Sequence, residues 1–472
     1  MTSFARIDIA DKATSATKPL TSASFTLQLA LFLVVNVAFI NGLIWHFSPG
    51  GFDDTVLKQS WDMLRGVGGD DSWGPMAAAL EHLAAWQPDG KPLYSAVFFE
   101  QGVKFQYPPS ALFGLEAMML FGEDRVRTYD EMAFPGLPPV NDLVGWAFMV
   151  MAAVCSAALL ELGLRRSLAS YGFDRFAIIR AALVFGFTLT FYPAIKAFTL
   201  GQIQLWINSA FALVMVLFVL RIRIASGVLM GAICLIKPHY GLVVLWGALN
   251  REWRFTAGCA AVGAVGLLFS ISHYGWWNHL DYLRVLSFMS ERGESYYANQ
   301  SINGLLNRLA SLFGTGSYAN VTFDAYGFPP YTPWVYWGTV VSSALILLAA
   351  FLRRSSEQDR VLAFSIIAVS LTIASPIAWE HHYGVFLPVF AFIAGTLAGD
   401  RRKLAFLAIC YTFVSNYVPL FNVLAETPFN VMQSYTFAGG LAFLILMHVS
   451  LSHHGRLSNQ VTRFLSNGRT KI

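Results

Sequence analysis

The sequence predicts an all-α polytopic membrane protein. Of its 472 residues, 56% are hydrophobic and only 13% are charged, whereas soluble domains average about 25% charged residues. Apolar runs of about 20 residues, the length that a membrane-spanning helix needs, recur along the whole chain. Short segments rich in Lys and Arg lie between several of them and indicate cytoplasmic loops. We therefore expect one continuous transmembrane domain over residues 24–452.

The first apolar run, residues 24–44, follows a polar segment, residues 1–23, that lacks the layout of a cleavable signal. It is expected to be a retained span with a cytoplasmic N-terminal segment before it. The region 50–141 contains thirteen acidic and only six basic residues, which places it outside the membrane as the larger part of an outer loop at about 45–141. A partial helix is expected within that loop, at 110–121.

The next span, 142–163, ends at "LRRSLASYGFDR", whose arginines mark the inner face. Spans at 177–195 and 203–220 follow, joined by the outer turn "KAFTLGQIQ". The segment 225–248 has basic sequence on both sides, and Pro238 would break a helix near its middle. Two half-helices that form a re-entrant hairpin, opened from the inner side, satisfy both observations.

The remaining apolar runs alternate regularly between the two faces. They predict spans at 256–272, 334–352, 361–379, 383–399, 404–420 and 435–452. A second large outer loop is expected at about 273–333, and a cytoplasmic tail at 453–472. The total is ten full spans plus the two partial segments, or about 10–13 transmembrane helices.

The four cysteines are Cys155, Cys234, Cys259 and Cys410. All lie in apolar segments without CxxC spacing, which argues against a disulfide framework and against a zinc site. The net charge of +4 is too small to indicate an acidic partner.

Five polar clusters fall on the same, outer side of this topology. They are "GGDDSW", "FQYPPSALF", "FTLGQIQLWIN", "YYANQSINGLLNRL" and "SPIAWEHHYG". Polar residues at membrane depth are costly and usually functional. Their position on one face indicates a single outward-facing site at the lipid boundary.

Each cluster also has a structural interpretation. The acidic pair Asp70 and Asp71 can belong to a solvated turn, and Lys196 can be an interfacial residue whose ammonium reaches water. The adjacent His381 and His382 invite a metal interpretation together with Glu380. Adjacent histidines do not share one helix face, however, so we expect no metal there.

Together the clusters supply complementary chemistry. A carboxylate such as Asp71 can act as general base on a hydroxyl. Arg308, Lys196 and the two imidazoles can stabilise a phosphate. The aromatic outer loops suit stacking against sugar rings. A base, a phosphate clamp and a lipid-facing groove are what a membrane glycosyltransferase with a lipid-phosphate sugar donor requires.

The ordered motifs between residues 66 and 390 resemble glycosyltransferase family 87, the polyprenyl-phosphate-mannose-type enzymes with the GT-C membrane fold. The motifs are Asp71, "FQYPP", "GQIQLWIN", "IKPHYG", "NQSINGLLNRL" and "SPIAWEHH". The resemblance implies transfer of a sugar, most often mannose, from a polyprenyl phosphate to an extracytoplasmic glycan or glycolipid, with inversion. It also implies a cell inner-membrane location and no obligatory metal or other cofactor.

The resemblance further implies a catalytic aspartate in the first outer loop. Asp71 matches best by its spacing to Tyr94 and Tyr107. Asp70 stays a close second, because Pro75 stands four residues after Asp71, where the family often has an aromatic residue. The family's tryptophan–histidine turn falls on Trp379, His381 and His382, near the donor phosphate.

Further residues are expected to bind the donor or the substrate. They are Tyr107, Gln202, Lys237, Asn299, Gln300 and Glu380. Asn299 and Gln300 would orient the donor or the interfacial helix, and Glu380 would orient an imidazole or an arginine. Lys237 is expected at the midplane or further inside, away from the outer cluster. It would reach the phosphate through the hairpin or pair with a carbonyl at the break. The segment 122–139 is expected to cover the acceptor side or to be a surface elaboration.

Two other functions stay open from the residues alone. A lipid-linked-sugar transporter or flippase would use ionisable residues along a path, here Arg180, Lys237 and His239. A glycan polymerase or ligase with a lipid-diphosphate donor fits the one-face chemistry equally well. The "YPP" and "NQS" motifs do not point to it.

Overall fold

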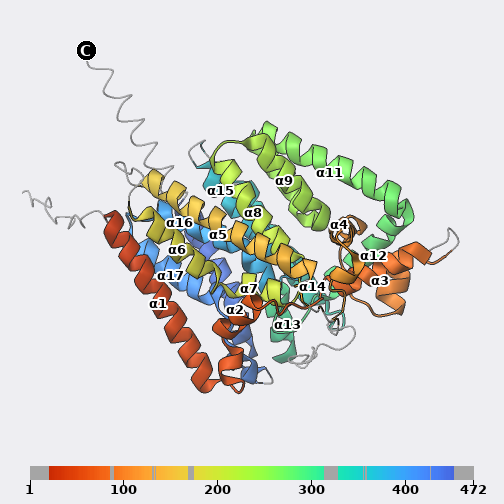
Figure 1. Ribbon diagram of the computed structural model, residues 1–472, viewed down its shortest axis with the longest axis horizontal. Coiled ribbons are helices and arrows are strands. Elements are labelled where there is room, and N and C mark those ends of the chain that lie inside the picture. Colours follow the sequence, from red (N-terminus) through yellow and green to blue (C-terminus); the bar gives the residue numbers. More distant parts are fainter. Residues whose placement is uncertain are drawn as a thin grey trace, which may run out of the picture.

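Figure 1 shows the computed structural model, which consists of helices and connecting segments. The structure describes residues 21–85, 90–129, 132, 134, 136–167, 175–312, 328–353, 356, 359–425 and 427–450. Within these ranges the only extended pairing is an isolated bridge between Asn299 and Trp379. Almost all of the expected N-terminal segment, all of the tail, and parts of the loops at 122–139 and 273–333 lie outside the described residues.

The α-helices span most of the described chain. They are α1 (Ser22–Phe47), α2 (Val56–Leu64), α3 (Trp73–Ala85), α4 (Leu112–Met119), α5 (Val140–Ser167), α6 (Ala177–Thr188), α7 (Tyr192–Thr199), α8 (Gln204–Val219), α9 (Arg223–Ile236), α10 (Leu242–Leu249), α11 (Trp253–Tyr274), α12 (Trp276–Arg292), α13 (Ile302–Leu312), α14 (Pro333–Phe351), α15 (Arg360–Ile373), α16 (Phe386–Thr396) and α17 (Arg401–Ser415). Short 3-10 turns include η5 (Pro238–Gly241), η6 (Glu380–Val385) and η8 (Asn430–Ser434), and η2 (Ser95–Glu100) is a π-helical turn.

Five helices in the described ranges are long and apolar enough to cross a membrane: α1, α5, α11, α14 and the helical segment Asn430–Ser450. The pair α6 and α7, bent by 54° at the break between them, is a sixth broken span or a re-entrant loop. Helices α8, α9 and α15 are apolar but shorter. The all-α polytopic prediction is confirmed, whereas the count of 10–13 transmembrane helices stays a prediction.

Helices α5, α8 and α16 form the centre of the bundle, with α9 and α11 packed along one edge and α1 along the opposite edge (Figure 1). The α5–α16 contact depends on small residues. A Cβ on Gly163 would lie 2.4 Å from the carbonyl oxygen of Phe392, and one on Gly395 would lie 2.4 Å from that of Leu160. Two glycines therefore let the backbones approach closely, as is common between membrane helices.

The predicted break in segment 225–248 is present. Helix α9 ends at Ile236, the turn η5 follows at Pro238, and the short helix α10 returns toward Arg251. The expectation that Lys237 lies away from the outer cluster was wrong, because its ammonium lies within hydrogen-bond distance of His382. The fourteen residues of α9 rise about 21 Å, which carries Lys237 to the level at which α8 begins.

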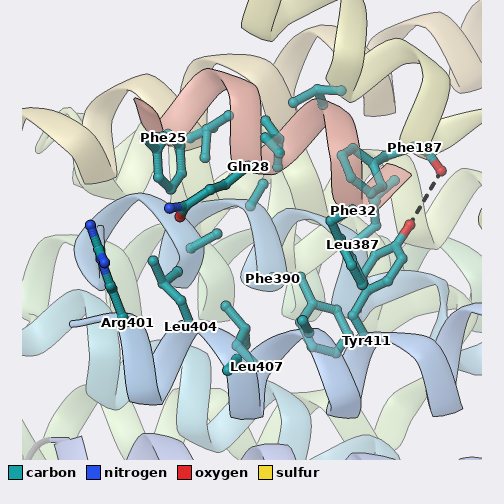
Figure 2. Close-up of a pocket in the computed structure, with 17 residues that line it drawn as sticks. Phe25, Gln28, Phe32, Phe187, Leu387, Phe390, Arg401, Leu404, Leu407 and Tyr411 are labelled. Carbon is teal, nitrogen blue, oxygen red and sulfur yellow. Dashed lines mark hydrogen bonds between the residues drawn. The ribbon is translucent and has the colours of Figure 1, made fainter. Parts of the chain in front are cut away.

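An apolar groove of about 380 Å³ lies between α1, α16 and α17 (Figure 2). Phe25, Phe32, Phe390 and Leu404 are among the side chains that line it, and Arg401 stands at one end. The groove has almost no polar lining. The acid–base chemistry expected from the sequence therefore belongs elsewhere in the molecule.

Candidate active site

A polar cavity of about 570 Å³ lies where α8 begins and where α9 and α15 end. Six of the predicted site residues line it: Asp71, Tyr107, Gln202, Lys237, His381 and His382. They come from four of the five polar clusters of the sequence and from the broken segment 225–248. Four of the five clusters therefore meet at one cavity, whereas no residue of the fifth, "YYANQSINGLLNRL", lines it.

The segment that carries Asp71 is held by backbone pairing with the turn before α8. The N–H groups of Gly69 and Asp71 donate to the carbonyls of Thr199 and Leu200, both at 2.9 Å. Gly201 has a φ of +69°, and a Cβ there would lie 1.9 Å from the carbonyl oxygen of Gly69. Only glycine fits this approach without a backbone shift, so Gly201 determines where the acidic segment sits.

Asp71 lines the cavity, and the side chain of Gln202 orients its carboxylate. The amide Nε2 of Gln202 donates to Asp71 Oδ2. The same amide is fixed from its other side, because Ser72 Oγ and Tyr107 Oη donate to its Oε1 at 2.9 and 2.8 Å. This network sets which end of the amide faces Asp71.

Asp70, the alternative base, does not line the cavity. Its carboxylate lies by the backbone of Gly74, where an added Cβ would come within 2.8 Å of Asp70 Oδ2. Of the two adjacent carboxylates, the one that faces the cavity is therefore Asp71.

The two imidazoles lie on η6, opposite Lys237. The ammonium of Lys237 has only donors, so it donates to His382 Nε2 at 2.7 Å. The backbone of Ile377 also acts on the ring of His382 and favours its charged form. Burial and the charge of Lys237 hold the pKa of His382 well below its ordinary value. Lys237 is thus part of the outer cluster and not remote from it.

Glu380 is buried behind the cavity and does not contact an imidazole through a hydrogen bond in the described network. Its Oε2 accepts from Tyr192 Oη at 3.0 Å, and its Oε1 has no hydrogen-bond partner among the described residues. Burial raises the pKa of Glu380 to about 7, although the positive charges of Lys196 and Arg308 lower it by favouring the ionised carboxylate. Lys196 is half-buried on α7 and does not line the cavity.

Arg308 is fully buried on α13 and does not line the cavity either. It donates to Ser434 Oγ at 2.7 Å and to the carbonyls of Tyr296, Tyr297 and Asn299 at 3.1, 2.9 and 2.9 Å. The guanidinium therefore fixes the loop before α13 and ties it to the last membrane helix.

Asn299 and Gln300 connect this loop to the backbone just before the two histidines. Asn299 donates to the carbonyl of Pro376 at 3.2 Å and accepts from the N–H of Ala378 at 3.0 Å. The N–H of Gln300 donates to the carbonyl of Ala378 at 2.8 Å, and the N–H of Glu380 donates to the carbonyl of Ala298 at 3.0 Å. The "NQS" motif holds the backbone from which the histidines extend.

Two further residues at the site, Lys104 and Glu294, were not predicted from the sequence. Lys104 lines the cavity directly before "FQYPP". Glu294 is buried just outside it and accepts a hydrogen bond from Trp379 Nε1. Burial raises the pKa of Glu294 to about 7, and Lys104 and Asp71 both act on it electrostatically. The only signal for either residue was its place beside a motif.

No group of three or more His, Cys, Asp or Glu side chains in the described ranges is arranged to hold a metal ion. The expectation of no metal or cofactor stays a prediction. Arg180, which a transport path would need free, instead forms an ion pair with Glu161 at 2.6 Å.

The model of glycosyltransferase family 87 matches residues 105–376, more than half of the chain. The chain belongs to glycosyltransferase family 87. It is similar to the polyprenol-phosphate-mannose-dependent alpha-(1-2)-phosphatidylinositol mannoside mannosyltransferase of Mycolicibacterium smegmatis (strain ATCC 700084 / mc(2)155), with 24% identity over 346 residues, 69% of this chain and 70% of the relative. No solved structure matches the chain.

This family 87 protein is a membrane glycosyltransferase, as the sequence motifs predicted. The family match includes Gln202, Lys237 and Arg308 but ends before η6 and begins after Asp71. Asp71 and the two histidines therefore lie outside the matched region, although they line the same cavity as Gln202 and Lys237.

Proposed function

We propose that this glycosyltransferase transfers mannose from a polyprenyl phosphate to a hydroxyl of an extracytoplasmic glycan or glycolipid, with inversion. The observation that carries the proposal is that a carboxylate, Asp71, and three basic side chains, Lys237, His381 and His382, line one cavity. The name of the mycobacterial relative, which includes polyprenol-phosphate-mannose and a phosphatidylinositol mannoside, supports the classes of donor and acceptor.

Asp71 is the general base in this mechanism, and Asp70 is the second candidate. The acceptor oxygen attacks the anomeric carbon from the face opposite the phosphate while its proton passes to the Asp71 carboxylate. The bond between the anomeric carbon and the phosphate oxygen breaks, and polyprenyl phosphate leaves with the electron pair. The amide of Gln202, fixed by Ser72 and Tyr107, keeps the carboxylate oriented toward the acceptor.

Lys237 and the imidazoles bind the donor phosphate. The ammonium that donates to His382 has two further protons for phosphate oxygens. Lys104 adds a second cation to the wall. Fixed donors around the phosphate stabilise the charge that develops on it as the sugar departs.

The predicted site residues that do not line the cavity, apart from Asp70, act on it through the backbone or through their charge. They are Arg308, Asn299, Gln300, Glu380 and Lys196. Arg308 and the two amides hold the loop that pairs with residues 376–380. They are positioning residues for His381 and His382. Lys196 offsets the buried Glu380 carboxyl from the other side.

The proposal places the enzyme in the cell inner membrane, with the cavity open to the extracytoplasmic side. The acidic region that carries Asp71 and the basic segments at the far helix ends support this orientation. No metal or cofactor takes part in the proposed reaction, so a chelator should leave turnover unchanged.

The test is sugar transfer by the purified full chain from synthetic polyprenyl-phosphate mannose to membrane acceptors. Asp71→Asn should lower kcat by about 10²–10⁴, the usual contribution of a general base. Asp53→Asn, which removes an exposed carboxylate from the same outer region, is the matched control and should turn over normally. Normal turnover by both Asp71→Asn and Asp70→Asn would refute the base assignment.

Donor chemistry is tested with the same preparation. Polyprenyl-phosphate mannose should be consumed, while a lipid-diphosphate mannose and a nucleotide-linked mannose should not. Preference for the diphosphate would favour a polymerase or ligase. Movement of labelled lipid without sugar transfer would favour a flippase.

A further inference from the structure

The acidic loop, residues 68–74, carries Asp71 and has a glycine near each end. Each glycine leaves space for a group from α5 or from the segment before it. A Cβ on Gly68 would lie 2.6 Å from Asp142 Oδ1, and a Cβ on Gly74 would lie 2.9 Å from the carbonyl oxygen of Thr128. Asp142 belongs to the first turn of α5. The two contacts therefore hold the acidic loop on both sides of the proposed base.

The side chain of Asp142 is enclosed between the acidic loop and Arg127. It is 4% exposed, and its Oδ2 accepts a hydrogen bond from Arg127 Nη2 at 3.2 Å. The same Oδ2 would lie 3.3 Å from a Cβ on Gly66, whose φ is +73°. The chain from Gly66 to Gly68 thus bends round one carboxylate. An enclosed carboxylate needs a partner within the protein, and Arg127, whose side chain is 13% exposed, is its cation.

The backbone of Arg127 is itself fixed by the neighbour of Asp142. The N–H of Arg127 donates to Asn141 Oδ1 at 2.7 Å, and Asn141 Nδ2 donates to the carbonyl of Arg127 at 3.2 Å. Val126 is fully buried and belongs to the same apolar cluster as Trp73 on α3. Residues 126–128 are therefore held by α5 and by the helix that follows Asp71.

This support differs from the one that Gly201 provides. The backbone pairing with residues 199–201 holds the acidic loop from the side of α8, whereas Asp142 and Thr128 contact it from the side of α5 and the segment 122–139. Neither Arg127 nor Asp142 lines the active-site cavity. Any effect that these two residues have on catalysis must therefore pass through the acidic loop.

We propose that Arg127 and Asp142 are positioning residues for Asp71. Their ion pair holds the acidic loop where the Asp71 carboxylate lines the cavity. The segment 122–139 then supports the base from behind instead of being a surface elaboration. This inference rests on the proposed role of Asp71 as general base.

The test measures kcat and KM of the purified full chain with polyprenyl-phosphate mannose. Arg127→Gln should lower kcat about 10- to 100-fold, because misplacement of a catalytic group by about 1 Å can cost 100-fold. The KM for the donor should stay unchanged, since Lys237 and the two histidines lie on other elements. Arg127→Lys, which keeps the charge, should recover most of the loss. Lys91→Gln, which breaks the exposed ion pair with Glu100 in the same outer region, is the matched control and should turn over normally.

The combination with Asp71→Asn separates this inference from the proposed function. In the Asp71→Asn background Arg127→Gln should cause no further loss, because the group that it positions no longer acts as a base. The same fold loss in both backgrounds would overturn the inference. Normal kcat of Arg127→Gln beside an impaired Asp71→Asn would overturn it and leave the base assignment intact. Normal turnover by Asp71→Asn would overturn both.

Asp142→Asn provides a second variant, because it keeps the shape of the side chain beside Gly68 and removes the charge. It should lower kcat with an unchanged donor KM, and it decides the question by the same readouts if Arg127→Gln does not fold. A rise in donor KM as large as the fall in kcat would indicate a general loss of structure and would overturn the positioning role.

Discussion

The two ends of the same helices carry charge in opposite ways. At the active-site end three charged groups are enclosed: Glu294, Arg308 and Glu380 are each at most 2% exposed. At the other end Arg166 and Arg221 are exposed on the wall of an open cavity. Enclosed charges need hydrogen-bond partners within the protein and hold loops in place, whereas exposed charges remain in contact with water.

The same contrast separates residues within the active-site end. Asp71 faces the cavity, and Arg308 donates four hydrogen bonds to protein atoms. Both were expected to contact substrate, because both are ionisable residues near a membrane boundary. Ionisable residues near a membrane boundary can therefore be catalytic residues, which face the substrate, or positioning residues, which fix the backbone that carries the catalytic ones.

The largest expected effect comes from the enclosed cation. Arg308→Met would leave the carbonyls of Tyr296, Tyr297 and Asn299 without their donor. Removal of one member of a buried polar network costs about 3–5 kcal/mol, so unfolding in detergent should occur at clearly lower temperature. Arg251→Met, at an exposed position, should change stability by less than about 0.5 kcal/mol. Equal stability of the two variants would contradict the positioning role.

The next effect concerns the glycine beneath the acidic segment. Gly201→Ala would place a Cβ 1.9 Å from the carbonyl of Gly69 and displace Asp71 from the cavity wall. Turnover should fall about 100-fold, because misplacement of a catalytic group by about 1 Å has this cost. Gly399→Ala, where no atom lies within 4 Å, is the control. If Gly201→Ala turned over like the control, the backbone pairing of residues 69–72 would not set the position of Asp71.

The sequence predicted which motifs meet but not what each side chain contacts. Apolar run length located the five helices that are long enough to cross a membrane, and the polar clusters located Asp71, Tyr107 and Gln202 at one cavity. The level of Lys237 was missed because it depends on the length of α9, which the position of Pro238 alone does not determine. The inward direction of Arg308 depends on packing against η8, a contact between residues more than 100 positions apart.

A smaller effect is a pH dependence of stability. Burial raises the pKa of Glu294 from 4.5 to about 7, so within this window the folded chain holds a proton that the unfolded chain has lost. Stability should therefore fall as the pH rises from 4.5 to about 7, by at most about 1.4 kcal/mol per pH unit from this one group.

Glu294→Gln removes this titration and keeps an oxygen to accept from Trp379. Its unfolding temperature should depend less on pH across the window than that of the wild type. Glu81→Gln, an exposed substitution on α3, should leave the wild-type profile intact. Identical profiles for Glu294→Gln and the wild type would show that Glu294 is not held protonated.

The smallest effect tests whether Lys237 contacts the donor phosphate or is a positioning residue. Lys237→Gln should lower kcat/KM for polyprenyl-phosphate mannose about tenfold, mainly through a higher KM, because it removes one charged donor to the phosphate. Lys237→Arg, which keeps the charge, should recover most of the loss. A purely structural lysine at the helix break would instead change the unfolding temperature with KM unaltered. That result would place Lys237 with Arg308 and leave Lys104 and the two imidazoles as the phosphate ligands.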